Sequence, residues 1–87
     1  MSEETLLEFP CQFPVKIMGN HTTGFENEMV MIARRHIPDL GEGSVKSRAS
    51  SSGKYLSVTI TFTATSKAQI DELYRDLNMH PDVKMML

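Results

Sequence analysis

The sequence predicts an α+β domain in which two helices cover one face of a four-stranded antiparallel sheet, and three observations predict it. Residues 55–64 alternate almost strictly between apolar and polar side chains, which is typical of a strand with one buried and one wet face. Two other segments repeat apolar residues at helical spacing, each between predicted strands. The resulting order is strand, helix, strand, strand, helix, strand, in a chain whose length suits one domain.

The first strand is predicted over residues 13–19, where apolar and polar side chains alternate up to a glycine. The first helix is predicted to begin at Thr23, because Thr23 and Glu26 have the spacing of a capping box, and to end before Pro38. Acidic residues near its start and basic residues near its end agree with the helix dipole. Its apolar stripe is Phe25, Met29, Ile32, Ala33 and His36 or Ile37.

The middle of the chain predicts a β-hairpin. Residues 45–49 suit a short edge strand, where Lys46 and Arg48 would discourage edge-to-edge association. Residues 50–53, Ser-Ser-Ser-Gly, suit the hairpin loop, because glycine takes positive φ without strain. The third strand, residues 55–64, then directs two sets of side chains to opposite faces. The core set is Leu56, Val58, Ile60, Phe62 and Ala64, and the solvent set is Tyr55, Ser57, Thr59, Thr61 and Thr63.

Thr65 or Ser66 is predicted to cap the second helix, and Ser66 with Gln69 repeats the capping-box spacing. A last strand follows over residues 83–87. This order is the split βαβ, or ferredoxin-like, arrangement, and right-handed crossovers place its first and third strands at the centre of the sheet. We therefore predict an N-terminal arm over residues 1–12 and a single ferredoxin-like domain over residues 13–87.

Composition and charge argue against several classes of function and of cellular location. The formal net charge of −2 provides no general attraction to nucleic-acid phosphates, so no nucleic-acid partner is expected. A single cysteine, Cys11, forms no disulfide within the chain and fits a reducing compartment. Residues 1–10 lack the basic and apolar regions of a secretion signal, and no apolar run approaches the roughly 20 residues that span a bilayer. The expectation is a cytoplasmic protein without a membrane partner.

The catalytic, metal-binding and RNA-binding uses of this fold find little support in the residues. His21, His36 and His80 are far apart in sequence, and the loop after the first strand has no cysteine pair, so no metal site is predicted. That loop also lacks the arginine with which acylphosphatase-like enzymes hold phosphate, and no carboxylates are paired for acid–base chemistry. RNA-binding domains of this fold stack bases on aromatic residues of the central strands, where this chain has serine and threonine. We predict no catalytic residue, no cofactor and no enzymatic activity, with RNA binding as a remote alternative.

Binding is the remaining class, and two groups of residues are candidates for it. The loop after the first strand precedes a helix N-terminus, where free amides receive an anion, and the serine turn offers hydroxyl donors. These ligand-binding candidates are Gly19, Asn20, His21, Gly24, Ser50, Ser51 and Gly53. The polar sheet face suits contact with another protein, and its candidates are Lys16, Tyr55, Ser57, Thr59 and Thr61.

Several segments together resemble the YbeD-like family of small bacterial proteins. They are residues 6–10, Phe13 with residues 16–19, residues 50–59, Leu73 with Tyr74, and residues 83–87. The resemblance implies a ferredoxin-like domain similar to ACT domains, which bind amino acids or other small metabolites, and a regulatory role connected with lipoate metabolism. The family has no assigned activity and no established site residues, and the first loop here lacks the acidic-Pro-Gly pattern of ACT domains.

Two hypotheses follow for the function. In the first, the chain is a regulatory domain that binds a small anionic metabolite at the first loop and the serine turn. In the second, it is an adaptor that binds a partner protein through the polar sheet face. A homodimer in which two copies join their sheets, as ACT domains often do, is compatible with either hypothesis.

Overall fold

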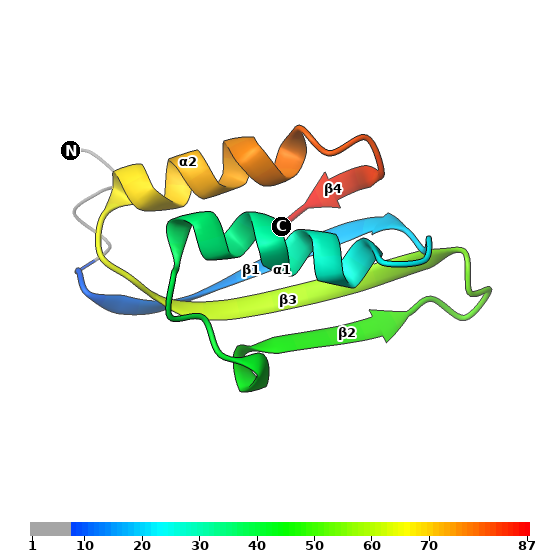
Figure 1. The fold of residues 1–87 in the computed structure, drawn as a ribbon, viewed down its shortest axis with the longest axis horizontal. Helices are drawn as coiled ribbons and strands as arrows, with labels where there is room; N and C mark the ends of the chain where they lie inside the picture. The colour runs from blue at the N-terminus through cyan, green and yellow to red at the C-terminus, as the bar shows by residue number, and fades with distance from the viewer. Residues whose placement is uncertain (1–7) are drawn as a thin grey trace.

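The computed structural model describes residues 8–87 and contains the predicted order of elements (Figure 1). The strands are β1 (Cys11–Asn20), β2 (Val45–Ala49), β3 (Tyr55–Ala64) and β4 (Val83–Met86), the helices are α1 (Phe25–His36) and α2 (Lys67–Asn78), and a 3₁₀ turn, η2 (Glu42–Ser44), precedes β2. The strands lie in the order β2-β3-β1-β4, and all neighbours are antiparallel. The ferredoxin-like prediction, with the first and third strands at the centre, is confirmed. Leu6 and Leu7 of the predicted arm lie outside the described residues.

The two central strands pair over their full length, from Cys11 opposite Ala64 to Asn20 opposite Tyr55. The first strand therefore begins at Cys11 rather than at the predicted Phe13, because β3 offers backbone partners beyond that point. The shorter strands β2 and β4 form the two edges of the sheet, and the edge position predicted for residues 45–49 is confirmed.

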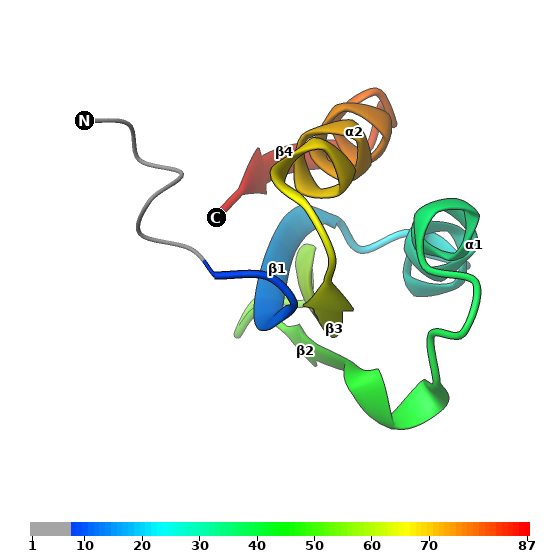
Figure 2. The same ribbon diagram turned by 90° about the vertical axis from the view of Figure 1, so that its left-hand side faces the viewer.

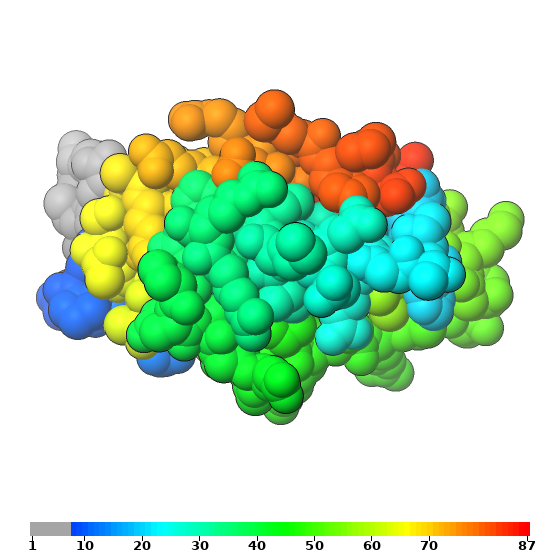
Figure 3. All heavy atoms as spheres, viewed as in Figure 1, coloured from blue at the N-terminus to red at the C-terminus, as the bar shows by residue number. Residues whose placement is uncertain are grey.

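Both helices lie on one face of the sheet, and the described part of the chain places no helix on the other face (Figure 2). The space-filling view from the helix side shows α1 and α2 lying next to each other over the strands (Figure 3). Within residues 8–87 neither helix is long and apolar enough to cross a membrane. The predicted core set of β3 is buried, together with Val15, Ile17, Phe25, Met29, Ala33, Ile37, Leu40, Ile70, Leu73 and Leu77.

The predicted cap of α1 at Thr23 is wrong. The N-cap is Gly24, whose φ of 86° is one that glycine adopts without strain, and no side chain caps the helix. A hydrogen bond from Phe25 N–H to Thr22 O, 3.1 Å long, forms a turn that ends the loop one residue later than predicted. Glu26, the second member of the predicted box, instead accepts a hydrogen bond from Ser47 Oγ at 2.5 Å.

Of the two predicted cap residues of α2, Thr65 and Ser66, the structure has Ser66 at the N-cap. Ser66 Oγ accepts a hydrogen bond from Gln69 N–H at 3.1 Å. Gln69 Oε1 reaches back to accept from Thr65 N–H at 2.8 Å, one residue before the position of an ordinary capping box. Gln69 Nε2 also donates to His36 O at 3.1 Å, which ties the start of α2 to the end of α1.

Candidate binding surface

The face of the sheet that the helices leave uncovered, here called the open face, is formed by alternate residues of the strands. The register identifies them, because directly opposite residues of neighbouring strands point to the same side. Two rows of side chains cross this face, the first consisting of Lys46, Thr59 and Lys16 and the second of Arg48, Ser57, Met18 and Met85. A hydrogen bond of 2.8 Å from Gln12 Nε2 to Thr63 Oγ1 joins two further side chains of the same face.

The open face is cationic. Lys16, Lys46 and Arg48 are all exposed, and the four strands, whose residues form this face, contain no Asp or Glu. The Asp and Glu residues of the described chain lie on helices, turns and loops instead, at Glu8, Glu26, Glu28, Asp39, Glu42, Asp71, Glu72, Asp76 and Asp82. Since the formal net charge of the chain is −2, the three cations form a local positive surface on an acidic protein.

Hydroxyl and apolar groups accompany these cations. Ser57, Thr59 and Thr61 are half-buried, although the polar side of β3 was predicted to face solvent. Large apolar side chains stand exposed nearby, with Tyr55 at 40% and Met85 at 51% of their full accessible surface. The open face therefore combines positive charge, hydrogen-bonding groups and an apolar margin, a mixture that is typical of non-permanent protein interfaces.

A hollow of about 320 Å³ lies where the open face meets the serine turn. It is lined by Met18, Arg48, Ala49, Ser50, Ser51, Tyr55 and Ser57. The structure thus brings two predicted ligand-binding residues, Ser50 and Ser51, together with two predicted interaction residues, Tyr55 and Ser57. Arg48 supplies the positive charge of this hollow.

The turn that borders the hollow is held together by its own serines. Ser50 N–H donates to Tyr55 O at 2.8 Å, and Ser50 Oγ accepts from Tyr55 N–H at 3.1 Å. Ser52 Oγ accepts from Lys54 N–H at 3.3 Å. Gly53 has a φ of 77°, which explains why the turn needs glycine at that position. Gly53 therefore shapes the turn through its backbone.

Gly19 and Asn20, two further candidates, have structural roles in the described fold. Gly19 is buried, and a Cβ atom at this position would lie 2.3 Å from Phe25 Cζ and 2.5 Å from Asp82 O, so it leaves no room for a ligand. Asn20 donates its backbone N–H to Asp82 O at 2.9 Å and its side-chain N–H to Asp82 Oδ1 at 3.1 Å. Both residues therefore join the end of β1 to its surroundings.

His21 and Gly24 lie on the helix side of the sheet. His21 Nδ1 is 3.1 Å from Gly53 O, and because a carbonyl only accepts, Nδ1 carries a proton and donates it in this contact. Both residues line a groove of about 750 Å³ between α1 and β2. The predicted ligand-binding set is thus divided between this groove and the open-face hollow that Ser50 and Ser51 line.

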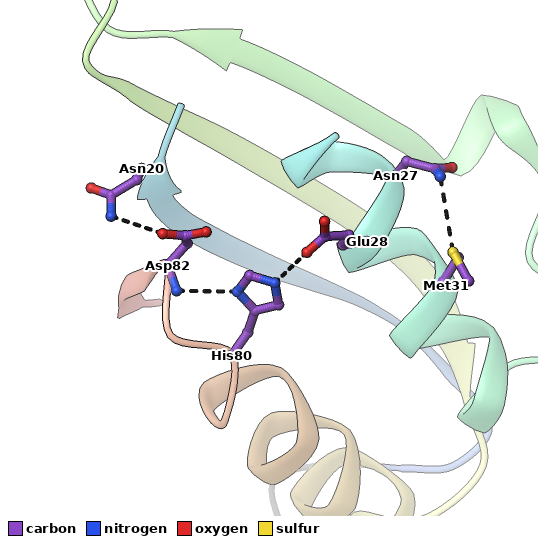
Figure 4. A network of polar contacts seen from close by, with 6 residues as sticks. All are labelled: Asn20, Asn27, Glu28, Met31, His80 and Asp82. Carbon is purple, nitrogen blue, oxygen red and sulfur yellow. Dashed lines mark hydrogen bonds and ion pairs between the residues drawn. The ribbon is translucent and has the colours of Figure 1, made fainter. Parts of the chain in front are cut away.

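The other two histidines make contacts that hold the helices in place. His80 Nδ1 accepts from Asp82 N–H at 3.1 Å, so its proton lies on Nε2, which donates to Glu28 of α1 (Figure 4). His36 Nε2 is bonded to Asp76 Oδ2 at 2.7 Å and joins α1 to α2. Within residues 8–87 no three His, Cys, Asp or Glu side chains are grouped so that they could hold a metal ion.

Sequence reasoning assigned Lys46 and Arg48 only a protective role at the sheet edge, although they supply most of the charge of the open face. Because the two residues are two positions apart on one strand, the sequence alone showed that their side chains point to the same face. The missing information was the register of the hairpin. A turn closed between Ser50 and Tyr55 sets Arg48 opposite Ser57 and so assigns both cations to the polar face.

Comparisons with known proteins place the chain in a family. The family model described as "Protein of unknown function (DUF493)" matches residues 4–87. The UPF0250 protein of Nitrosomonas europaea is 45% identical over the whole of both chains, and that of Leptothrix cholodnii is 49% identical over 98% of this chain and 93% of its own.

A solved structure carries the same fold at low sequence identity. The solution structure of HP0495 from Helicobacter pylori superposes with a TM-score of 0.72, covering 93% of this chain and 85% of its own at 12% identity. A second solution structure of HP0495 gives a TM-score of 0.60 over 100% of this chain and 96% of its own at 11% identity. The resemblance to the YbeD-like family is confirmed by the sequence relatives, and the ferredoxin-like α+β fold by the structure. The chain belongs to the DUF493 family, whose curated relatives are called UPF0250 proteins.

Proposed function

We propose that this chain is a non-enzymatic, cytoplasmic regulatory module that binds an acidic segment of a partner protein on its open face. The observation that carries the proposal is the placement of Lys16, Lys46 and Arg48 in two adjacent rows of a sheet whose strands contain no Asp or Glu. Opposite charge favours encounter with such a partner and disfavours partners of like charge.

The chemistry of the open face supports reversible rather than permanent binding. A single exposed ion pair contributes about 0–1 kcal/mol, so three cations together provide orientation and modest affinity. The exposed apolar margin at Tyr55 and Met85 supplies contact area that charge alone does not. Arg48 adds a planar guanidinium that binds a carboxylate through two parallel hydrogen bonds. Moderate affinity of this kind suits a regulatory module that releases its partner.

The proposal is tested by a heteronuclear NMR titration of the protein with an oligoglutamate peptide, using an oligolysine peptide as the control. The amide signals of β1, β2 and β3 near the three cations should shift on addition of oligoglutamate, and the shifts should weaken as salt is added, because exposed charges are screened. Shifts spread evenly over the helices, or no shifts at all, would show that the open face does not bind acidic segments.

A matched pair of variants assigns the binding to the correct face. Lys46→Glu with Arg48→Glu should abolish the oligoglutamate shifts. Arg35→Glu with Arg75→Glu changes the net charge by the same amount on exposed helical positions and should leave them in place. Equal losses in both variants would mean that net charge alone, and not the open face, attracts the peptide.

A small anionic metabolite is a second candidate ligand, and the hollow beside the serine turn favours it. There Arg48, Ser50, Ser51 and Ser57 line one space of about 320 Å³. The link with lipoate metabolism rests on the family resemblance alone. Thermal-shift measurements with amino acids, lipoate and related carboxylates should give a rise in melting temperature that Arg48→Ala removes. Absence of any rise at concentrations far above a physiological level would dismiss this candidate.

A further inference from the structure

The outer edge of β2 has unpaired backbone groups in a known pattern. Backbone pairing in an antiparallel hairpin alternates along the strand. Because Ser50 N–H donates to Tyr55 O, the residues that exchange hydrogen bonds with β3 are Arg48 and Lys46, at steps of two along β2. The amides of Ser47 and Ala49 therefore point away from β3, toward the edge at which residues 8–87 place no further strand.

The two sides of this edge offer different chemistry. On the open-face side stand the exposed cations Lys46 and Arg48. On the helix side lies the groove of about 750 Å³ between α1 and β2, whose lining includes the apolar residues Val30, Val45 and Leu56. A strand added along the edge would direct successive side chains alternately to these two sides.

We propose that the acidic partner segment binds as an extra strand along the free edge of β2, in an extended conformation with carboxylates alternating with aliphatic side chains. This inference rests on the proposed function and specifies how the partner binds. The carboxylates meet Lys46 and Arg48, the aliphatic side chains enter the groove at Val30 and Val45, and the edge amides of β2 bind the main chain of the segment. Main-chain hydrogen bonds give affinity, and the alternate side chains give specificity.

Charge also argues against a second copy of the chain as the occupant of this edge. Two β2 strands paired antiparallel about Ser47 would set Lys46 of one copy opposite Arg48 of the other. Like charges directly opposite on neighbouring strands are destabilising. The same two residues that repel self-association therefore attract an acidic strand.

The order of residues in the partner segment is tested with two peptides of identical composition. One alternates glutamate with valine, and the other has all its glutamates before its valines. Fluorescence anisotropy should show the alternating peptide binding about tenfold or more tightly, because only it satisfies both sides of the edge. N-methylation of every second amide of the alternating peptide, on its edge-facing side, should remove this advantage.

Variants at Ser47 test the edge itself. Ser47→Pro removes the outward amide at a position where proline is tolerated in an edge strand, so it should lower binding of the alternating peptide to that of the block peptide. Ser47→Ala loses the hydroxyl that bonds to Glu26 but keeps the amide, and should change binding less than about twofold. Circular dichroism checks that both variants keep the wild-type fold.

The outcomes separate this inference from the proposed function. Ser47→Pro should leave the oligoglutamate response of the open face intact. Equal binding of the two peptides by the wild-type protein would overturn the added-strand inference while that response survives. Loss of the oligoglutamate response in the wild type would instead overturn the proposed function.

Discussion

The two faces of one sheet differ in composition although the same strands build both. On the covered face Val15, Ile17, Val58 and Ile60 have no exposed surface, and the helices pack directly on them. On the open face their sequence neighbours include Lys16, Ser57, Thr59 and Thr61, and Lys16 is exposed. Side-chain alternation along a strand therefore lets two adjacent residues serve unrelated purposes.

This difference indicates that stability and binding depend on different residues of the sheet. Burial of apolar surface is the dominant favourable contribution to folding, and it is concentrated under the helices. Exposed charges and hydroxyls on the open face contribute little to stability but set which partners are attracted. Substitutions on the two faces should therefore affect different measurements.

The largest expected effect comes from a cavity on the covered side. Leu73 of α2 has no exposed surface, so Leu73→Ala removes buried carbon atoms and leaves space that the neighbours only partly fill. The free energy of unfolding, measured by urea denaturation, should fall by about 2–5 kcal/mol. The control Thr61→Ala on the open face should change it by less than about 0.5 kcal/mol. Comparable losses in the two variants would contradict the division between faces.

A smaller effect is expected at the end of β1, where the covered side is most crowded. Gly19→Ala places a methyl group against Phe25 Cζ and Asp82 O, and the latter is a backbone atom that cannot rotate away. The free energy of unfolding should fall by about 1–3 kcal/mol, as for overpacked cores. Gly43→Ala is the matched control, because no atom lies within 4 Å of a Cβ there. An unchanged free energy of unfolding for Gly19→Ala would show that the atoms around this end of the strand move aside at little cost.

The crowding at Gly19 also shows what sequence reasoning can and cannot find. The architecture was predictable because residues 55–64 alternate and both helices have apolar stripes, and these are local patterns with a known period. The role of Gly19 depends on Phe25 and Asp82, which approach it only after folding. A glycine at the end of a strand looks the same in sequence whether it faces a ligand or a phenyl ring.

The helix caps show the same limit. Ser66 and Thr23 both had capping-box spacing in the sequence, and only Ser66 caps a helix. The difference arises because Gly24 takes a left-handed conformation and displaces the start of α1 past Thr23. For the binding surface, the sequence showed that Lys46 and Arg48 point to the same face of their strand. Which face that is depends on the register of the hairpin, which only the folded structure gives.

The helices that cover the sheet should therefore respond differently at their starts. Ser66→Ala removes the acceptor for Gln69 N–H and should lower the free energy of unfolding by about 1 kcal/mol. Thr23→Ala removes no capping hydrogen bond and should change it by less than about 0.5 kcal/mol. Urea denaturation of both variants measures the contrast. A larger loss for Thr23→Ala than for Ser66→Ala would mean that the caps are assigned the wrong way round.

The smallest expected effect lies at the rim of the covered face and appears only at alkaline pH. Tyr74 donates its hydroxyl to Leu87 O at 3.2 Å and lies edge-on to Phe13, and partial burial raises the pKa of its phenol above the usual 10.0. The folded state then keeps this proton at a pH where the unfolded chain has lost it. The contribution of Tyr74 to the free energy of unfolding is complete below pH 10 and decreases as pH rises through the folded pKa. The stability of the folded state therefore falls with increasing pH in that window.

Replacing Tyr74 with phenylalanine should remove this contribution to the alkaline loss of stability. The difference in unfolding free energy between the wild type and Tyr74→Phe, measured by urea denaturation at neutral pH, provides the baseline for the lost hydrogen bond. The same difference measured at about pH 11 should shift in favour of the variant. Only the unfolded wild type gains stability there by ionising this phenol. An unchanged difference would mean that the Tyr74 hydroxyl is as accessible to solvent as the side chains of the open face, so that Tyr74 does not belong to the covered side.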